Sequence, residues 1–154
     1  EYGVAPDVVA YRSARADGLN GYCRWERGFR EGREGDAYYG VCTAEQEEDF
    51  LPAYRDGQRV YAAEQALANA RSSVESLGSR LAELDDKIVA KQAEARAEGL
   101  TDAQRDQIRN RIQELRRERA DTEREWRRGQ DAVDDAERDV RDVRRMFQGI
   151  YGGW

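Results

Sequence analysis

The sequence predicts an all-α protein in which a small, disulfide-stapled helical head, rich in glycine and aromatic residues, carries a long antiparallel two-helix coiled-coil hairpin. Apolar residues recur at alternating spacings of three and four along two long stretches, which is typical of a coiled-coil seam. A short turn containing glycine separates the two stretches. Both cysteines of the chain lie before the first stretch, among glycines and aromatic rings.

The composition is too polar for one large hydrophobic core and favours helices that share a narrow apolar seam. Charged residues make up 38% of the 154 residues, and the mean hydropathy is −1.00. The net charge of −6 comes from interspersed acids and bases, so we expect no nucleic-acid partner, which would need a basic face. Histidine is absent, which removes the usual general base and the commonest zinc ligand. We therefore expect neither an enzyme nor a cofactor or metal site.

Residues 1–59 are predicted to form the head, which contains an internal repeat. The stretch YRSARADGLNGYC begins at Tyr11, and FREGREGDAYYGVC begins at Phe29. Each opens with an aromatic residue and arginine and ends in Gly-x-Cys, which indicates a short helix closed by glycine and a turn that delivers a cysteine. A third copy, YRDG, begins at Tyr54. Small residues would let these helices approach closely while aromatic rings fill the space around them: Ala14, Gly32 and Gly57, with Tyr11, Phe29 and Tyr54.

The repeat places Cys23 and Cys42 at equivalent ends of two units, where they can meet. A disulfide helps most in a small polar domain with little core, and closing this loop would contribute about 3 kcal/mol in the chain-entropy model. The alternatives are two free structural thiols or a redox-active pair, although the wide separation and the lack of a Cys-x-x-Cys motif weigh against redox chemistry. We interpret the pair as a structural disulfide, which implies an oxidising compartment.

Residues 60–148 are predicted to form the hairpin, with its turn near residues 99–101. The seam of the first arm comprises Val60, Ala63, Leu67, Ala70, Val74, Leu77, Leu81, Leu84, Ile88, Lys91 and Ala95. The seam of the second arm comprises Ile108, Ile112, Leu115, Arg119, Thr122, Trp126, Gly129, Val133, Ala136, Val140, Val143, Phe147 and Ile150. Two such seams joined by a short turn predict antiparallel helices that cover each other's apolar face.

Local signals mark where the helices begin and end. The motif TAEQ at Thr43 reads as a capping box that starts a helix ahead of the hairpin, and Pro52 then either kinks this helix or opens the next one. Gly99 can close the first arm, and the motif TDAQ at Thr101 forms a second capping box that starts the second arm.

Folding the chain at the turn predicts which residues face each other. The expected layers pair Ile88 with Ile112, Leu84 with Leu115, Val74 with Trp126 and Ala70 with Gly129. A large ring beside a glycine is what volume compensation in a packed seam requires. Among charged neighbours of the seam, the same register pairs Arg80 with Glu118 and Asp85 with Arg116, but brings Glu64 near Glu137.

Three polar residues interrupt the seam, namely Lys91, Arg119 and Thr122. We expect them to extend to solvent or to specify the register; the alternative is a notch where a partner docks. Because the seam satisfies itself, we expect a monomer, with a domain-swapped dimer as the alternative.

The C-terminal tail GIYGGW, residues 149–154, is predicted to pack back on the head. Phe147 would return opposite residues near 53, which places Ile150, Tyr151 and Trp154 beside the head.

Roughly residues 1–60 resemble a family of Gram-negative envelope proteins known only as a domain of unknown function. The resemblance lies in VAPDVVAYRSARADGLNGYC, GFREGREGDAYYGVC and DFLPAYRDGQ, and both cysteines fall in context. Ala14 departs from it, because the family usually has glycine at that place. Members are typically predicted lipoproteins, so the resemblance implies a periplasmic or outer-membrane-associated protein. Membrane contact would come only through a lipid anchor upstream of this chain.

We therefore expect a structural or protein-interaction component of the bacterial cell envelope, with the hairpin as a spacer or docking arm and an envelope protein or glycan as partner. The alternative is a binding module or inhibitor whose aromatic, arginine-rich head captures a glycan or an exported protein. Its candidate contact residues are Trp25, Arg30, Tyr38 and Tyr39. The same rings could instead form the core of the small head.

Overall fold

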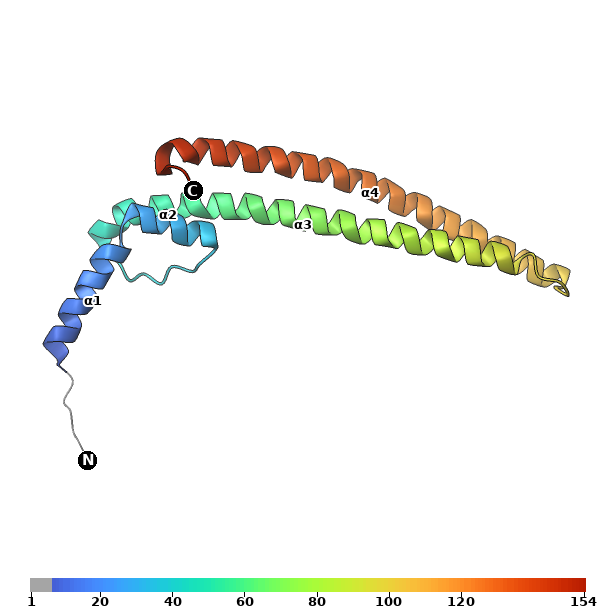
Figure 1. The fold of residues 1–154 in the computed structure, drawn as a ribbon, viewed down its shortest axis with the longest axis horizontal. Helices are drawn as coiled ribbons and strands as arrows, with labels where there is room; N and C mark the ends of the chain where they lie inside the picture. The colour runs from blue at the N-terminus through green and yellow to red at the C-terminus, as the bar shows by residue number, and fades with distance from the viewer. Residues whose placement is uncertain (1–6) are drawn as a thin grey trace, which may run out of the picture. The chain divides into compact units, whose positions relative to one another are not determined.

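The computed structural model describes residues 7–154, so the first six residues of the predicted head lie outside the described residues. The helices of this part of the chain are α1 (Val8–Tyr22), α2 (Trp25–Glu34), α3 (Ala44–Glu94) and α4 (Asp102–Tyr151), and Figure 1 shows their course. No strand occurs among the described residues. The predicted all-α class is confirmed, and α3 and α4 form the predicted antiparallel hairpin.

Contacts within the chain divide it into two compact units. The head unit comprises Glu1–Gln65 and Asp139–Trp154, and the arm unit comprises Ala66–Arg138. The C-terminal end of α4 therefore belongs with the head unit, and each long helix contributes residues to both units. Within residues 7–154, the helices all lack an apolar run that could span a membrane.

The predicted capping boxes define where both long helices begin. At the start of α3, the Thr43 N–H donates to the Gln46 side chain at 3.1 Å, and the Gln46 N–H donates back to the Thr43 hydroxyl at 3.4 Å. The same reciprocal pair precedes α4, at 2.8 and 3.2 Å, between Thr101 and Gln104. Gly99 lies in the connecting turn with a φ of 77°, a left-handed conformation that glycine adopts without strain.

Pro52 lies inside α3, which continues through it from Ala44 to Glu94. Proline lacks the backbone N–H that would bond to the preceding turn, yet tertiary packing carries the helix past this position. The alternative in which Pro52 opens a new helix is therefore wrong, and a single helix of 51 residues runs from the head unit into the arm unit.

The heptad positions are the covered positions of the hairpin. In the arm unit, Leu84, Ile88 and Leu115 form a buried cluster, as the predicted layers near the turn require. The seam residues are buried or half-buried with the exception of Ile150, which is 62% exposed. The seam prediction is thus confirmed up to Phe147.

Farther from the turn, the predicted layers are wrong by about one helical turn. A Cβ atom built on Gly129 would lie 2.9 Å from Cγ2 of Val74, so this glycine faces Val74 rather than Ala70. Trp126 instead lies against Gly78, whose built Cβ would be 3.7 Å from the indole nitrogen. Val74 and Trp126 thus each lie against a glycine, and the lack of a Cβ is needed at Gly129, whereas a Cβ at Gly78 would make an ordinary contact.

The charged pairs near the middle of the arm unit follow this shift only in part. The predicted pair between Arg80 and Glu118 is confirmed. Asp85 binds Arg119, with 2.5 Å between carboxylate and guanidinium, instead of the predicted Arg116. The hydrogen bond from Arg119 is the main reason that the pKa of Asp85 is lowered.

Glu64 and Glu137, predicted to approach each other, each bind an arginine instead. In the head unit, Glu64 lies 2.6 Å from Arg144, and in the arm unit Glu137 lies 2.7 Å from Arg71. The shift in register therefore replaces a repulsive contact with two ion pairs. Exposed pairs contribute only about 0–1 kcal/mol each, so apolar packing decides the register and the charges follow it.

The three polar seam residues all have partners within the hairpin. Lys91 lies 2.6 Å from Glu94, and Arg119 binds Asp85. The Thr122 hydroxyl donates to a backbone carbonyl four residues earlier at 2.9 Å. These contacts satisfy the polar groups where they interrupt the seam.

In the head unit, glycines bring α2 and α3 into close contact. A Cβ atom built on Gly32 would lie 2.0 Å from the carbonyl oxygen of Tyr54, and one built on Gly57 would lie 2.2 Å from that of Phe29. Neither position can hold a larger residue without moving the helices apart. The predicted close approach through small residues is confirmed for the second and third copies of the repeat.

The first copy of the repeat behaves differently, and the prediction for it is wrong. Tyr11 is 68% exposed and Ala14 is also exposed, because α1 buries none of its residues. Gly18 and Gly21 lie inside the helix with open space around them, rather than closing it. The helix ends at Tyr22.

The C-terminal tail lies against α2 within the head unit. The ring of Tyr151 stacks on Phe29 with 4.1 Å between centroids, and Trp154 lies 5.4 Å from the same ring. Phe147 completes this group and is almost fully buried. Ile150 lies beside the head as predicted, where it lines a cavity with Trp25 and Pro52, but it remains exposed rather than joining the buried group.

Candidate functional site

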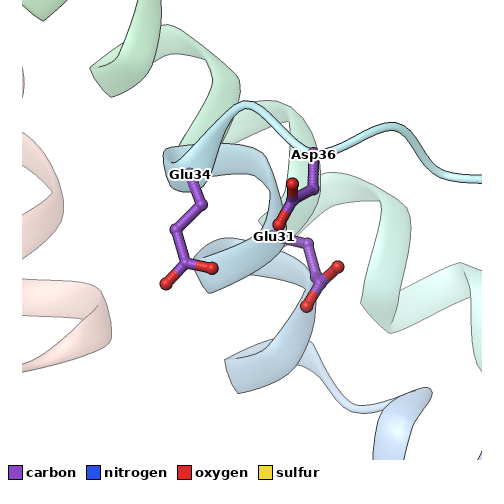
Figure 2. A group of neighbouring side chains, drawn as sticks. All are labelled: Glu31, Glu34 and Asp36. Atoms are coloured by element: carbon purple, nitrogen blue, oxygen red, sulfur yellow. The ribbon is translucent and has the colours of Figure 1, made fainter.

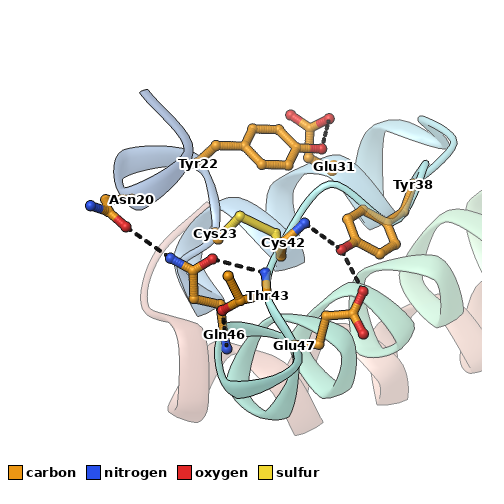
Figure 3. The surroundings of a disulfide bond; sticks show 9 residues. All are labelled: Asn20, Tyr22, Cys23, Glu31, Tyr38, Cys42, Thr43, Gln46 and Glu47. Carbon is orange, nitrogen blue, oxygen red and sulfur yellow. Dashed lines mark hydrogen bonds between the residues drawn. A yellow bond between two sulfur atoms is a disulfide. The ribbon is translucent and has the colours of Figure 1, made fainter. Parts of the chain in front are cut away.

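The disulfide joins the end of α1 to the segment that leads into α3 (Figure 3). Cys23 and Cys42 are bonded, with their Cα atoms 5.7 Å apart, so the predicted disulfide is confirmed. Beside it, the side-chain amide of Gln46 donates to Asn20 at 2.9 Å. The Cys23 N–H also donates to the carbonyl of Leu19 at 2.7 Å and ends the helix. The disulfide and these hydrogen bonds fasten α1 through its C-terminal end.

Tyr38 holds the loop that carries the second cysteine. Its hydroxyl accepts from the Cys42 N–H at 3.0 Å and donates to Glu47 at 2.7 Å. Its ring lies 4.9 Å from Phe50. Desolvation, followed by the hydrogen bond to Glu47, raises the pKa of Tyr38, so the hydroxyl keeps its proton and remains a donor at neutral pH. These contacts engage Tyr38 within the head unit.

Three acidic residues gather at the end of α2 (Figure 2), where oxygens of Glu31, Glu34 and Asp36 lie within 4.8 Å of one another. Glu31 is 8% exposed and already has two partners. Arg27 lies 2.5 Å from one oxygen, and the Tyr22 hydroxyl donates to the other at 3.4 Å. The buried charge is therefore compensated by the protein, so the arrangement does not require a cation.

A concave surface of the head unit surrounds Trp25, the first residue of α2. Trp25 is 40% exposed, and the centroid of its ring lies 5.6 Å from that of Tyr151. Three cavities of about 470, 290 and 300 Å³ all share Trp25 as a lining residue. We call these cavities together the Trp25 groove.

The residues that line the Trp25 groove come from three helices. The largest cavity lies between the starts of α2 and α3, and is lined by Cys23, Arg24, Trp25, Glu26, Glu45, Gln46 and Asp49. The second lies between α2 and the tail, and is lined by Trp25, Glu26, Phe29, Arg30, Arg33, Glu34, Tyr151 and Trp154. The third lies between α3 and the tail, and is lined by Trp25, Glu48, Asp49, Pro52, Ala53, Ile150 and Tyr151.

Cation–π and hydrogen-bond contacts hold the tail side of the groove in place. The guanidinium of Arg33 lies 4.3 Å from the ring of Trp154. The Tyr151 hydroxyl donates to Asp56 of α3 at 2.8 Å. Burial, followed by this hydrogen bond, raises the pKa of Tyr151 to about 12. The wall of the groove is therefore built from residues whose positions are fixed by several contacts each.

The predicted contact residues fall into two groups. Trp25 and Arg30 both line the Trp25 groove. Tyr38 is half-buried beside the disulfide, and Tyr39 is 84% exposed on the loop between α2 and α3. The structure therefore brings together two of the four residues and leaves the two tyrosines outside the groove.

Sequence reasoning missed the acidic side of the groove, which comes from Glu45, Glu48 and Asp49 at the start of α3. These residues belong to the run EQEEDF, in which Glu45 lies in the first turn of α3 and is explained equally well by the helix dipole. Only the three-dimensional structure distinguishes them from other surface acids, because it places them beside an exposed tryptophan from another helix. With aromatic walls and carboxylates at its edge, the arrangement is suited to binding a ligand or a partner.

Residues 1–59 match a model of the protein family described as "Protein of unknown function (DUF2799)". The match confirms the predicted resemblance to a domain of unknown function over nearly the same residues, which include both cysteines. Comparisons with curated proteins and with solved structures found no match.

Proposed function

We propose that the protein is a structural or protein-interaction component of the bacterial cell envelope, located in the periplasm or at the outer membrane. The observation that carries this proposal is the Cys23–Cys42 disulfide, which stabilises a small head and would form in an oxidising compartment. The hairpin uses its apolar seam internally and presents charged faces to solvent, as a spacer or docking arm would. In this proposal the protein is a monomer without catalytic activity, and any membrane contact comes through an upstream lipid anchor.

A second candidate function is a binding module or inhibitor whose head captures an envelope glycan or an exported protein. The specific observation in its favour is the Trp25 groove, because exposed aromatic rings beside cavities are typical of ligand and partner sites. The two functions differ in which part of the molecule contacts the partner. They agree on the compartment.

Thiol trapping tests the compartment. The protein is expressed from its natural gene in the native bacterium, and intact cells are treated with an alkylating reagent before and after reduction. We expect Cys23 and Cys42 to resist alkylation until the reductant is added. Alkylation of both thiols before reduction would contradict the assignment to an oxidising compartment.

Site-specific photocrosslinking in the same cells tests which part binds. The full-length chain carries the crosslinker either at Val89, an exposed position of the arm unit, or at Ile150, an exposed position of the head unit that lines the Trp25 groove. An envelope adduct from Val89 supports the docking arm, and adducts from Ile150 alone favour the binding module. The lack of any envelope adduct from either position would contradict both.

A further inference from the structure

The floor of one part of the Trp25 groove is apolar and uncovered. Pro52 and Ile150 line the same cavity as Trp25. All three residues are exposed, and Ile150 is more exposed than Trp25. Ile150 continues the heptad of α4 but turns away from the seam of the hairpin. An exposed apolar surface rimmed by polar groups is characteristic of an interaction site.

The rim of two of the three cavities is predominantly acidic, whereas the cavity beside the tail also contains Arg30 and Arg33. Glu48 and Asp49 line the cavity with the apolar floor, and Glu26 and Glu45 line its neighbour on the other side of Trp25. Arg24 is the single cationic residue among the residues that line these two cavities. Four carboxylates therefore face one guanidinium.

These carboxylates are also unpaired within the described part of the chain. Glu26, Glu45, Glu48 and Asp49 take part in no ion pair or side-chain hydrogen bond with another residue of the range 7–154. Other acids of the head unit do form ion pairs, as Glu64 does with Arg144. No arginine or lysine of the described residues therefore neutralises these four carboxylates through an ion pair.

We propose that the Trp25 groove binds a cationic peptide segment of a partner protein, in which an apolar residue contacts the floor and neighbouring lysine or arginine residues reach the acidic rim. The aliphatic part of a lysine or arginine can lie on the indole of Trp25 while its charge meets the carboxylates. Charge complementarity selects this partner over an acidic peptide or an anionic glycan. The inference rests on the proposed interaction function and names the class of partner.

The test is an NMR titration of the full-length, disulfide-bonded chain labelled with nitrogen-15. The probes are two synthetic peptides of equal length and equal leucine content, one with lysines and one with glutamates at the same positions. The indole N–H signal of Trp25 is identified from its absence in the variant Trp25→Phe. We expect the lysine peptide to shift this signal and the amides of Glu48 and Asp49, and the glutamate peptide to leave them unchanged.

Matched variants separate binding at the groove from general attraction to an acidic protein. The groove variant Glu45→Gln/Glu48→Gln/Asp49→Asn should weaken binding of the lysine peptide by about tenfold. The control variant Glu125→Gln/Asp131→Asn/Asp134→Asn removes the same charge from exposed positions of the arm unit and should leave the affinity unchanged. All six positions are exposed, so both variants are expected to fold, which the dispersion of their amide spectra verifies.

Three outcomes would overturn the inference. They are a Trp25 signal that does not move with the lysine peptide, equal affinity of the two triple variants, and tighter binding of the glutamate peptide. If the lysine peptide does not bind at the groove but Val89 gives an envelope adduct in cells, the inference is wrong and the proposed function is still supported. Binding at the groove without any envelope adduct in cells would contradict the proposed function while the groove chemistry holds.

Discussion

The helices α1 and α2 begin from the same sequence pattern and occupy opposite environments. Tyr11 and Phe29 hold the same place in the repeat, yet Tyr11 is 68% exposed and Phe29 only 5%. On α2, Gly32 allows the helix to lie directly on the backbone of α3, whereas Ala14 at the equivalent place on α1 is exposed. The difference teaches that an aromatic residue followed by a small residue three positions later forms a packing motif only where a second helix lies against that face.

The physical cause is how each helix is attached. α2 is flanked by α3 along its glycine face and by the tail at Phe29, so its contacts extend over its length. α1 is fastened by the disulfide and by neighbouring hydrogen bonds at its C-terminal end. Isolated helices of this length are marginal in water, and the two internal glycines of α1 lower its intrinsic stability further.

The largest difference is expected from truncating the equivalent aromatic residues. Phe29→Ala should destabilise the head by about 3–5 kcal/mol, because it removes a buried ring that contacts Phe147, Tyr151 and Trp154. Tyr11→Ala should change the free energy of unfolding by less than about 0.5 kcal/mol. Hydrogen exchange of peptides from α2, followed by mass spectrometry, measures both. Similar effects of the two substitutions would show that α1 is packed after all.

Removal of the disulfide should cost about 3 kcal/mol and act most strongly on α1. In Cys23→Ser/Cys42→Ser, the amides of α1 should lose their protection from hydrogen exchange, because the helix loses its covalent attachment. Amides around Leu84 in the arm unit serve as the internal control and should exchange as before. Retained protection in α1 would mean that the hydrogen bonds at its end hold it without the disulfide.

Addition of a single methyl group should act in opposite directions on the two helices. Gly32→Ala places a Cβ 2.0 Å from a backbone oxygen of Tyr54 and should destabilise the head by about 1–3 kcal/mol. Gly18→Ala adds the same group in open space within α1 and should stabilise that helix by about 0.5–1 kcal/mol. Urea unfolding followed by circular dichroism measures the first change. Helix-specific hydrogen exchange measures the second, and a loss of protection in α1 would contradict it.

The smallest effect is a pH dependence that involves α2 through the tail. Tyr151 stacks on Phe29, and its pKa is raised from 10.0 to about 12. Because the folded state binds this proton more tightly than the unfolded chain, its contribution is complete below pH 10 and is lost as the pH rises towards 12. The free energy of unfolding should therefore fall more steeply over this range in the wild type than in Tyr151→Phe. Parallel pH profiles of the two proteins would contradict the assignment.

Elements defined by nearby residues could be predicted from the sequence. Thr43 and Thr101 form their capping boxes with residues three positions away, and the heptad spacing selects one face of a helix without reference to the rest of the fold. The hairpin, its turn and the burial of Leu84, Ile88 and Leu115 follow from these local rules. The candidate site was predictable in part, because Trp25 and Arg30 stand out by composition.

Features that depend on residues distant in the sequence required the tertiary structure. The positions of Gly129 opposite Val74 and of Trp126 beside Gly78 depend on how two helices fit around one large ring, which spacing alone does not specify. The acids that rim the Trp25 groove lie at the start of α3, and their relation to Trp25 exists only after α2 folds back on α3.

The sequence by itself therefore determined the class of fold, the helix starts, the disulfide partners and the apolar seam, because each arises from short-range geometry or from a choice with only two cysteines. Tertiary structure decided the register of the hairpin, the separate fates of α1 and α2, and the composition of the groove. Those features result from steric fit and charge between segments far apart in the chain. A Cβ at Gly32 or Gly57, for example, would be destabilising only because the backbone of another helix lies against that position.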